Sequence, residues 1–106
     1  MNKGFDMDRF KPVLTFIEKL CVAGSPNSRT KHTKNWDMTA QSNTRDWTSF
    51  EITDTEKDSC AFCGNFDFWT KTLAIVESHD KKLENAIISA FRNIYTKEFS
   101  CKREHT

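Results

Sequence analysis

The sequence predicts an α+β domain in which two helices lie on one face of a small antiparallel sheet. Apolar residues recur at helical spacing over residues 8–23 and again from Ser78 or Asp80 to about residue 98. Between these segments, apolar and polar residues alternate as they do in β-strands. The chain has 106 residues, a common size for one domain, so we expect residues 1–106 to fold as a single domain.

The first helix is expected over residues 8–23. Its apolar residues recur at i, i+3, i+4 and i+7 and form one stripe, which consists of Phe10, Val13, Leu14, Ile17, Leu20 and Cys21. Asp8 can cap the first turn, and Pro12 lies early enough in the helix to be tolerated. Gly24 and Pro26 then predict the end of the helix.

A polar segment from Gly24 to Asn35 follows the first helix. It contains no apolar residue that could attach it to a core, and it is the most basic stretch of the chain, with Arg29, Lys31 and Lys34. A connection of this length is usually functional or mobile. We therefore expect residues 24–35 to form a flexible basic loop.

The middle of the chain predicts a small antiparallel sheet. Apolar and polar residues alternate over residues 36–41 and again over residues 47–53, with a turn near residues 42–45, and this pattern favours a hairpin. Residues 66–76 are rich in aromatic and β-branched side chains and are expected to add a third strand. A helix over part of that last range is the alternative.

The last helix has the clearest pattern in the chain. Its apolar stripe matches helical spacing throughout and consists of Leu83, Ala86, Ile87, Ala90, Phe91, Ile94 and Tyr95. Polar side chains occupy the opposite face of this helix. From about residue 99 onward we expect a short charged tail, which contains Cys101 and His105.

Charge and hydropathy limit the functions that this chain can have. The formal net charge is +1, which argues against a protein that coats nucleic acid or anionic lipid. No segment is long and apolar enough to cross a bilayer, and Glu18 and Lys19 interrupt the one stretch that could resemble a signal peptide. We therefore expect a cytoplasmic protein without membrane contact, in which the four cysteines are reduced.

Residues 60–64, Cys-Ala-Phe-Cys-Gly, are the strongest candidate for special chemistry. Two thiolates at this spacing can bind one metal ion when the chain turns tightly between them, and the glycine permits such a turn. A structural zinc site would use three thiolates and one imidazole, from Cys60, Cys63, Cys101 and His105. The reserve ligands are Cys21, His32 and His79.

Two other interpretations of Cys60 and Cys63 remain open. In the first, they are small core residues beside Phe62 and Phe66. In the second, they form a redox pair or a disulfide, and a redox role requires a helix N-terminus after a buried strand to lower the thiol pKa. The polar residues at 53–59 do not predict such a strand, and no other catalytic set stands out, so we expect no enzymatic activity.

Aromatic and basic residues mark the surfaces that we expect to bind a partner. The chain has nine Phe, three Trp and one Tyr, and tryptophan is common at binding hot spots. The candidate partner-binding residues are Trp36, Trp47, Trp69, Arg29, Lys31 and Lys34. We expect a non-enzymatic protein–protein interaction module. Because a basic loop beside a tryptophan also occurs in single-strand binders, a small zinc-dependent nucleic-acid-binding protein is the alternative.

The whole chain also resembles the small early proteins with which bacteriophages disable host machinery. The likeness is to the anti-RecBCD proteins of P22-like phages. It is carried by residues 7–20, Met-Asp-Arg-Phe-Lys-Pro-Val-Leu-Thr-Phe-Ile-Glu-Lys-Leu, by the Gly-Ser-Pro-Asn-Ser segment and by the tryptophans of the middle region. This resemblance implies a protein of the host cytoplasm that binds the RecBCD helicase–nuclease and alters its handling of DNA ends without catalysis. It assigns no role to an individual residue.

Overall fold

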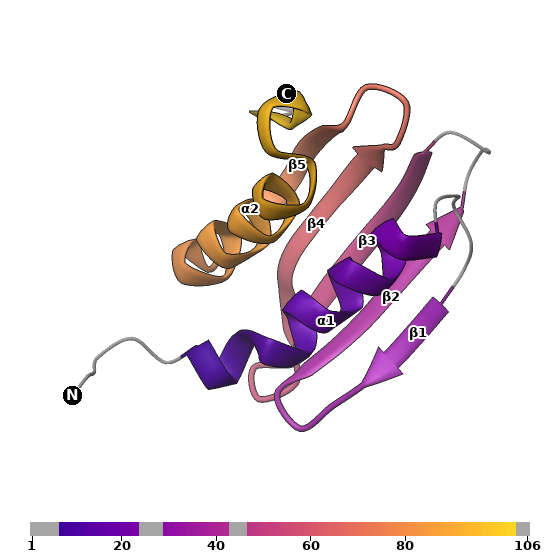
Figure 1. Cartoon of the computed structure of the whole chain (residues 1–106). Helices are drawn as coiled ribbons and strands as arrows, with labels where there is room; N and C mark the ends of the chain where they lie inside the picture. The colour runs from indigo at the N-terminus through magenta and orange to yellow at the C-terminus, as the bar shows by residue number, and fades with distance from the viewer. Residues whose placement is uncertain (1–6, 24–28, 43–46, 104–106) are drawn as a thin grey trace.

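A six-stranded mixed β-sheet forms the centre of the protein (Figure 1). The computed structural model describes residues 7–23, 29–42 and 47–103. The elements are α1 (Met7–Ala23), β1 (Arg29–His32), β2 (Trp36–Ser42), β3 (Trp47–Asp54), β4 (Ser59–Asp67), β5 (Thr72–Ser78), α2 (Lys81–Tyr95), a 3₁₀ turn (Thr96–Glu98) and β6 (Ser100–Arg103). The strands lie in chain order across the sheet, antiparallel from β1 to β5, whereas β6 is parallel to β5 because α2 connects them.

The prediction of a small three-strand antiparallel sheet with helices at both ends of the chain is wrong. The N-terminal helix is present, and β2 pairs with β3 as the expected hairpin. However, the sheet has six strands, and α2 is followed by β6 rather than by a charged tail. Residues 29–32, expected within a flexible loop, form β1. The predicted helix stop at Gly24 and Pro26 and the hairpin turn at residues 43–45 lie outside the described residues.

The two edge strands explain most of this difference. Both β1 and β6 have four residues, Arg-Thr-Lys-His and Ser-Cys-Lys-Arg, and neither shows the apolar alternation of a half-buried strand. An edge strand pairs through its backbone on one side and keeps charged side chains in solvent, which also discourages pairing with other chains. Such strands are therefore nearly invisible to a search for apolar periodicity.

The strand predicted over residues 66–76 is two strands with a tight turn between them. Asp67 begins this turn, because its Oδ1 accepts hydrogen bonds from the backbone N–H of Trp69 at 2.8 Å and of Thr70 at 3.1 Å. Asp54 accepts two backbone hydrogen bonds in the same way at the turn between β3 and β4. An aspartate whose side chain accepts hydrogen bonds from the backbone two residues later favours a turn, and the turn at Asp67 divides the predicted strand into β4 and β5.

Both helices cover the same face of the sheet, and no described element covers the other face (Figure 1). The core between the helices and the sheet is rich in stacked rings, with centroids 4.3 Å apart for Phe66 and Phe91. Trp36 has no exposed surface, and its Nε1 donates a hydrogen bond to the carbonyl of Arg9 at 2.7 Å. This bond attaches α1 to β2. No helix in the described part of the chain is long and apolar enough to cross a membrane.

Glu84 fastens the C-terminal strand to α2. Its side chain is buried, and Oε2 lies 2.6 Å from Nη2 of Arg103 on β6 and 3.2 Å from Nζ of Lys81. Asp80 caps the helix, since its Oδ1 accepts a hydrogen bond from the backbone N–H of Leu83 at 3.1 Å. Polar contacts on the helix-covered side of the sheet therefore hold β6 against α2.

Candidate functional site

The face of the sheet away from the helices is the candidate functional site, and we call it the open face. The strand register assigns to it Thr30 and His32 of β1, Asp37, Thr39 and Gln41 of β2, Trp47, Ser49, Glu51 and Thr53 of β3, Cys60, Cys63, Asn65 and Asp67 of β4, Thr72, Ala74 and Glu77 of β5, and Ser100 and Lys102 of β6. Four of these residues carry carboxylates, whereas Lys102 is the only lysine or arginine in this described set. The open face is therefore acidic.

Two β-bulges decide which side chains reach the open face. The register shift between β3 and β4 leaves Ala61 without a partner residue on β3, so Cys60 and Cys63 both point away from the helices. In a regular strand, residues three positions apart point to opposite faces. A second shift leaves Val76 of β5 unpaired and places Glu77 opposite Cys63. The bulges thus gather two thiols and a carboxylate at one end of the open face.

The thiols of Cys60 and Cys63 are poor nucleophiles in this setting. Burial raises the pKa of Cys60 to about 11, and the charges of Glu51 and Glu77 add to the increase. The pKa of Cys63 is raised by the same causes. Because the thiolate is the reactive form of cysteine, these surroundings disfavour a redox or nucleophilic role.

The residues expected to bind zinc do not converge in the described part of the chain. Cys101 is the partner of Leu73 in the pairing of β6 with β5, so its thiol lies on the helix-covered side, opposite to Cys60 and Cys63. His105 lies outside the described residues. Across residues 7–23, 29–42 and 47–103, no three His, Cys, Asp or Glu side chains are grouped to hold a metal ion. The donors as placed do not fit a tetrahedral site.

The reserve ligands make other contacts. The thiol of Cys21 on α1 hydrogen-bonds to Tyr95 on α2. Nδ1 of His32 lies 3.0 Å from a carboxylate oxygen of Asp37, and Nε2 of His79 lies 2.7 Å from one of Glu77. Each histidine therefore has a carboxylate neighbour on an exposed surface.

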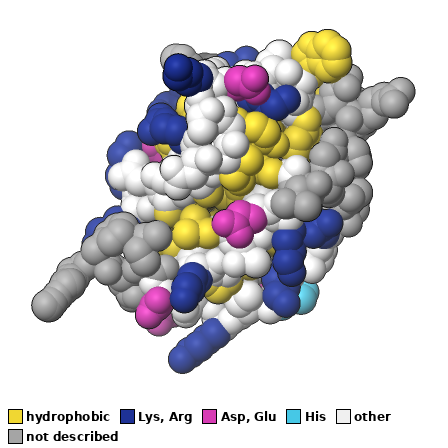
Figure 2. Space-filling model, viewed as in Figure 1, with side chains coloured by type: hydrophobic (Ala, Val, Ile, Leu, Met, Phe, Trp, Pro, Cys, Tyr) yellow, Lys and Arg dark blue, Asp and Glu magenta, His cyan; other side chains and the backbone are white. Residues whose placement is uncertain are grey.

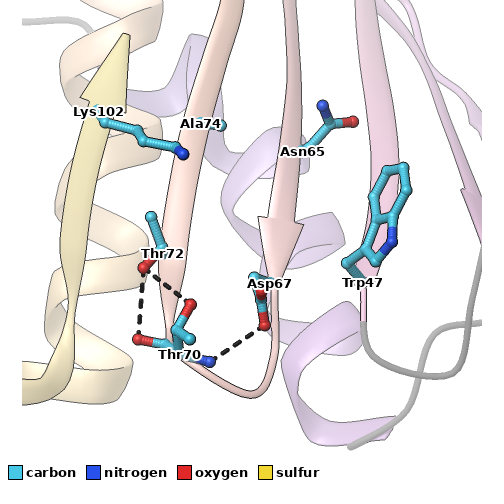
Figure 3. A pocket seen from close by; sticks show the side chains of 7 residues that line it. All are labelled: Trp47, Asn65, Asp67, Thr70, Thr72, Ala74 and Lys102. Carbon is cyan, nitrogen blue, oxygen red and sulfur yellow. Dashed lines mark hydrogen bonds between the residues drawn. The ribbon is translucent and has the colours of Figure 1, made fainter. Parts of the chain in front are cut away.

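A shallow hollow lies at the other end of the open face, between β3 and β6 (Figure 3). Its volume is about 450 Å³, and it is lined by Trp47, Asn65, Asp67, Thr70, Thr72, Ala74 and Lys102. Trp47 and Asp67 are partners across β3 and β4; the indole of Trp47 borders the hollow on one side, and the carboxylate of Asp67 lies at the end near the turn, beside Thr70 (Figure 3). The two backbone hydrogen bonds to Oδ1 of Asp67 hold this carboxylate in place. The hollow thus combines an aromatic wall with an oriented negative charge.

The structure separates the residues that were predicted to bind a partner. Trp47 lines the hollow, Trp36 is buried in the core, and Trp69 is 81% exposed at the turn between β4 and β5. The three basic residues lie at the edge of the sheet formed by β1 and at the turn after it: Arg29, Lys31 and Lys34. These six residues therefore do not form one surface.

The carboxylates of the open face and Lys102 were missed by reasoning from sequence. Glu51 follows the regular alternation of β3, whereas Glu77 reaches the same face only because of the bulge at Val76, and a bulge leaves no periodic signal in the sequence. Asp67 is the exception, since an aspartate before Phe-Trp-Thr-Lys marks a turn and hence the end of a strand.

Comparison with known proteins gives no relative from which a function could be transferred. No family model matches the chain, and neither a curated protein nor a solved structure is significantly similar to it. The charge of the open face and the hollow lined by Trp47 therefore carry the functional argument by themselves.

Proposed function

We propose that this protein binds another protein through the open face of its sheet and acts without a catalytic step of its own. The observation that carries the proposal is the charge of this uncovered face, where Asp37, Glu51, Asp67 and Glu77 outnumber Lys102. Complementary charge steers association and selects the partner. The partner surface is accordingly basic.

The hollow at Trp47 supplies the anchor of this interface. In this proposal an arginine side chain of the partner stacks on the indole ring and pairs with the carboxylate of Asp67, because a guanidinium group can make both contacts and both residues line the hollow. Tryptophan is among the residues that contribute most to protein–protein affinity. Trp47 and Asp67 are thus the proposed hot spot, and the remaining acidic residues orient the approach.

We further propose that the partner is a host nuclease complex and that the protein is a phage-type inhibitor or modulator of it. The resemblance of residues 7–20 and of the tryptophan-containing middle region to anti-RecBCD proteins supports this choice. The charge of the open face agrees with it, since a nuclease holds the phosphate backbone of DNA on a basic surface. An acidic protein face that occupies such a surface would compete with DNA.

Purified RecBCD tests both parts of the proposal. We expect the wild-type protein to bind the complex and to change its nuclease activity on linear double-stranded DNA. Trp47→Ala and Asp67→Lys should each weaken binding by about 10- to 30-fold, as truncation of a hot spot does. Glu98→Lys, an equal charge reversal at an exposed position after α2, is the matched control and should bind like the wild type.

The possible failures are distinguishable. Full binding by the Trp47→Ala and Asp67→Lys proteins would show that the open face is not the interface. No binding of the wild-type protein would remove RecBCD as the partner. The partner of the open face would then be another protein with a basic surface.

The alternative function, zinc-dependent binding of nucleic acid, is disfavoured by the charge of the open face, because carboxylates repel phosphates. The basic edge at β1, with Lys31 exposed, is the contact that this alternative would use. A fluorescence-anisotropy titration with labelled single-stranded DNA at about 50 and 200 mM salt measures this alternative directly. Tight binding that falls steeply with salt and is lost in Lys31→Glu would favour it over the open-face proposal.

A further inference from the structure

A groove between the two helices lies on the side of the molecule opposite to the open face. Its volume is about 570 Å³, and its apolar lining comes from Leu14 of α1 and from Ala86, Ala90 and Ile94 of α2. Figure 2 shows hydrophobic side chains gathered in a band across this side of the molecule. Ile94 is 38% exposed, which is unusual for a large aliphatic residue on the apolar stripe of a helix. Ala86 belongs to the core, and Leu14 and Ala90 pack against it. The outer surfaces of these residues, together with Ile94, form an apolar surface on the described part of the chain.

The two helices that form the groove run side by side in the same direction (Figure 1). Cys21 near the end of α1 hydrogen-bonds to Tyr95 at the end of α2, and a second hollow of about 270 Å³ at this end is lined by both residues together with Glu18 and Ile94. Lys82 lies in the first turn of α2, at the other end of the groove. The distance from Lys82 to Ile94 along the helix is about 18 Å, at 1.5 Å per residue.

The two ends of the groove carry opposite charges, and they also differ in the size of their apolar side chains. Lys82 stands at one end and Glu18 at the other, and neither makes an ion pair with another described residue. The small side chain of Ala86 lies at the end of Lys82, and the large side chain of Ile94 lies at the end of Glu18. A second copy turned by 180° would place Lys82 against Glu18 and Ile94 against Ala86, and each contact would occur twice.

We infer that this groove is the interface of a two-fold symmetric homodimer. The self-complementary order of charge and size selects a second copy of this chain as the occupant, because a closed two-fold interface must match itself. The two helices present a face only about 25 Å long, so the interface is at the small end of the range for specific complexes and the dimer should form at micromolar concentrations. The dimer leaves both open faces outward and available to partners.

Sedimentation velocity from about 1 µM to about 1 mM tests the dimer. We expect the wild-type protein to pass from monomer to dimer over this range. Glu18→Lys and Lys82→Glu should each weaken dimerisation by about 10-fold or more, since either change creates two like-charge contacts. The double variant with both changes should recover most of the affinity, because the reversed pairs form again.

Two further variants keep the experiment decisive. Ile94→Asp should abolish the dimer while circular dichroism reports an unchanged fold, because this side chain is already partly exposed. Lys97→Glu, at an exposed site in the 3₁₀ turn, is the control and should dimerise like the wild type. A monomer at all concentrations, or a double variant that does not recover, overturns the inference. A monomer that still binds RecBCD would overturn the dimer alone and leave the open-face proposal standing.

Discussion

The two faces of the sheet differ sharply in chemistry, although the same strands supply both. Trp36 of β2 and Trp47 of β3 show the difference most directly. Trp36 points toward the helices, has no exposed surface and donates a hydrogen bond to the Arg9 carbonyl. Trp47 points away from them and lines the hollow beside Asp67. The side of the strand, and not the residue type, therefore decides whether a tryptophan serves the core or a surface.

The residues that stabilise the fold lie on one face of the sheet, and the residues proposed to bind a partner lie on the other. The helix-covered face buries nearly all of the large apolar side chains, including the stacked pair Phe66 and Phe91. The open face carries carboxylates, hydroxyls and two thiols with unfavourable surroundings for ionisation. Substitutions on the covered face should therefore lower the free energy of unfolding, whereas substitutions on the open face should change binding and leave stability nearly unaltered.

The matched tryptophan pair gives the largest expected effect. Trp36→Ala should lower the free energy of unfolding by about 4 kcal/mol, because it removes a fully buried ring and a buried hydrogen bond. Trp47→Ala should lower it by no more than about 1 kcal/mol, as expected for a partly exposed side chain. Urea unfolding followed by circular dichroism measures both. Equal losses in the two variants would contradict the assignment of the two faces.

Gly64 and Asn65 are adjacent residues of β4 on opposite faces of the sheet, and they provide a second test of the difference between the faces. A Cβ atom at this position would lie 3.0 Å from the carbonyl oxygen of Ala74 and 3.0 Å from the ring of Phe62, so a methyl group would push these neighbours apart by a few tenths of an ångström. Gly64→Ala should cost about 2 kcal/mol through overpacking. The control is Asn65→Ala on the open face, which should cost less than about 0.5 kcal/mol. A control that loses as much as the glycine variant would place both residues in the core.

Glu84 should show a smaller, pH-dependent effect. Burial alone would raise the pKa of its carboxyl group, but hydrogen bonds from Ser78, Arg103 and Lys81 outweigh burial and lower the pKa below its ordinary value of 4.5. A lowered folded-state pKa stabilises the fold above the unfolded-state pKa, and this stabilisation is lost as the pH falls through the folded-state pKa.

Glu84→Gln should therefore destabilise the protein by about 1–2 kcal/mol at pH 7, as expected for the loss of charged hydrogen bonds. The difference from the wild type should shrink as the pH falls below 4.5 and through the lowered pKa of the native carboxylate. Thermal unfolding at pH 7, 5 and 3 measures this change. Glu98→Gln at an exposed site is the control and should change the stability by less than about 0.5 kcal/mol. A constant difference across the three pH values would argue against the charged contact between α2 and β6.

The thiols of the open face give the smallest expected effect on the fold and the most local report on its charge. A pKa of about 11 leaves Cys60 with about 100-fold less thiolate at pH 8 than a thiol at the ordinary value of 9.0. Alkylation by iodoacetamide, followed at Cys60 by peptide mass spectrometry, should be slower than that of a model peptide in the same proportion. Glu51→Gln combined with Glu77→Gln should accelerate it several-fold. Alkylation at the rate of the model peptide would show that Cys60 is not in these surroundings.

Local patterns in the sequence were sufficient for some elements. The apolar stripes over residues 8–23 and 83–95 predicted α1 and α2, because one buried stripe at helical spacing is enough to fold a helix onto a core. The alternation over residues 36–53 likewise predicted the pairing of β2 with β3. The edge strands were missed because only their backbone is used, and β4 and β5 were merged because the turn signal of Asp67 was overlooked.

The candidate site was harder to predict than the fold. Of the residues expected to bind a partner, Trp47 alone lies on the open face, and the thiols that suggested a zinc knuckle lie in an extended strand. Gly64 explains why that motif misled. The glycine suits a tight turn around a metal, but here it accommodates the Phe62 ring and the neighbouring strand. A glycine suits both a tight turn at a metal site and close packing between strands, and the sequence alone does not distinguish these two uses.

The sequence by itself determined the two helices, the central hairpin and the aromatic character of the core, because each depends on contacts between residues close in the chain or on a periodic apolar pattern. Only the tertiary structure decided the edge strands, the pairing of β6 with β5 and the membership of the open face. The edge strands depend on the fold because they contribute mainly backbone hydrogen bonds, and the membership of the open face depends on the bulges at Ala61 and Val76. One extra residue in a strand reverses the face of every side chain beyond it, so the composition of each face is set by the partner strands.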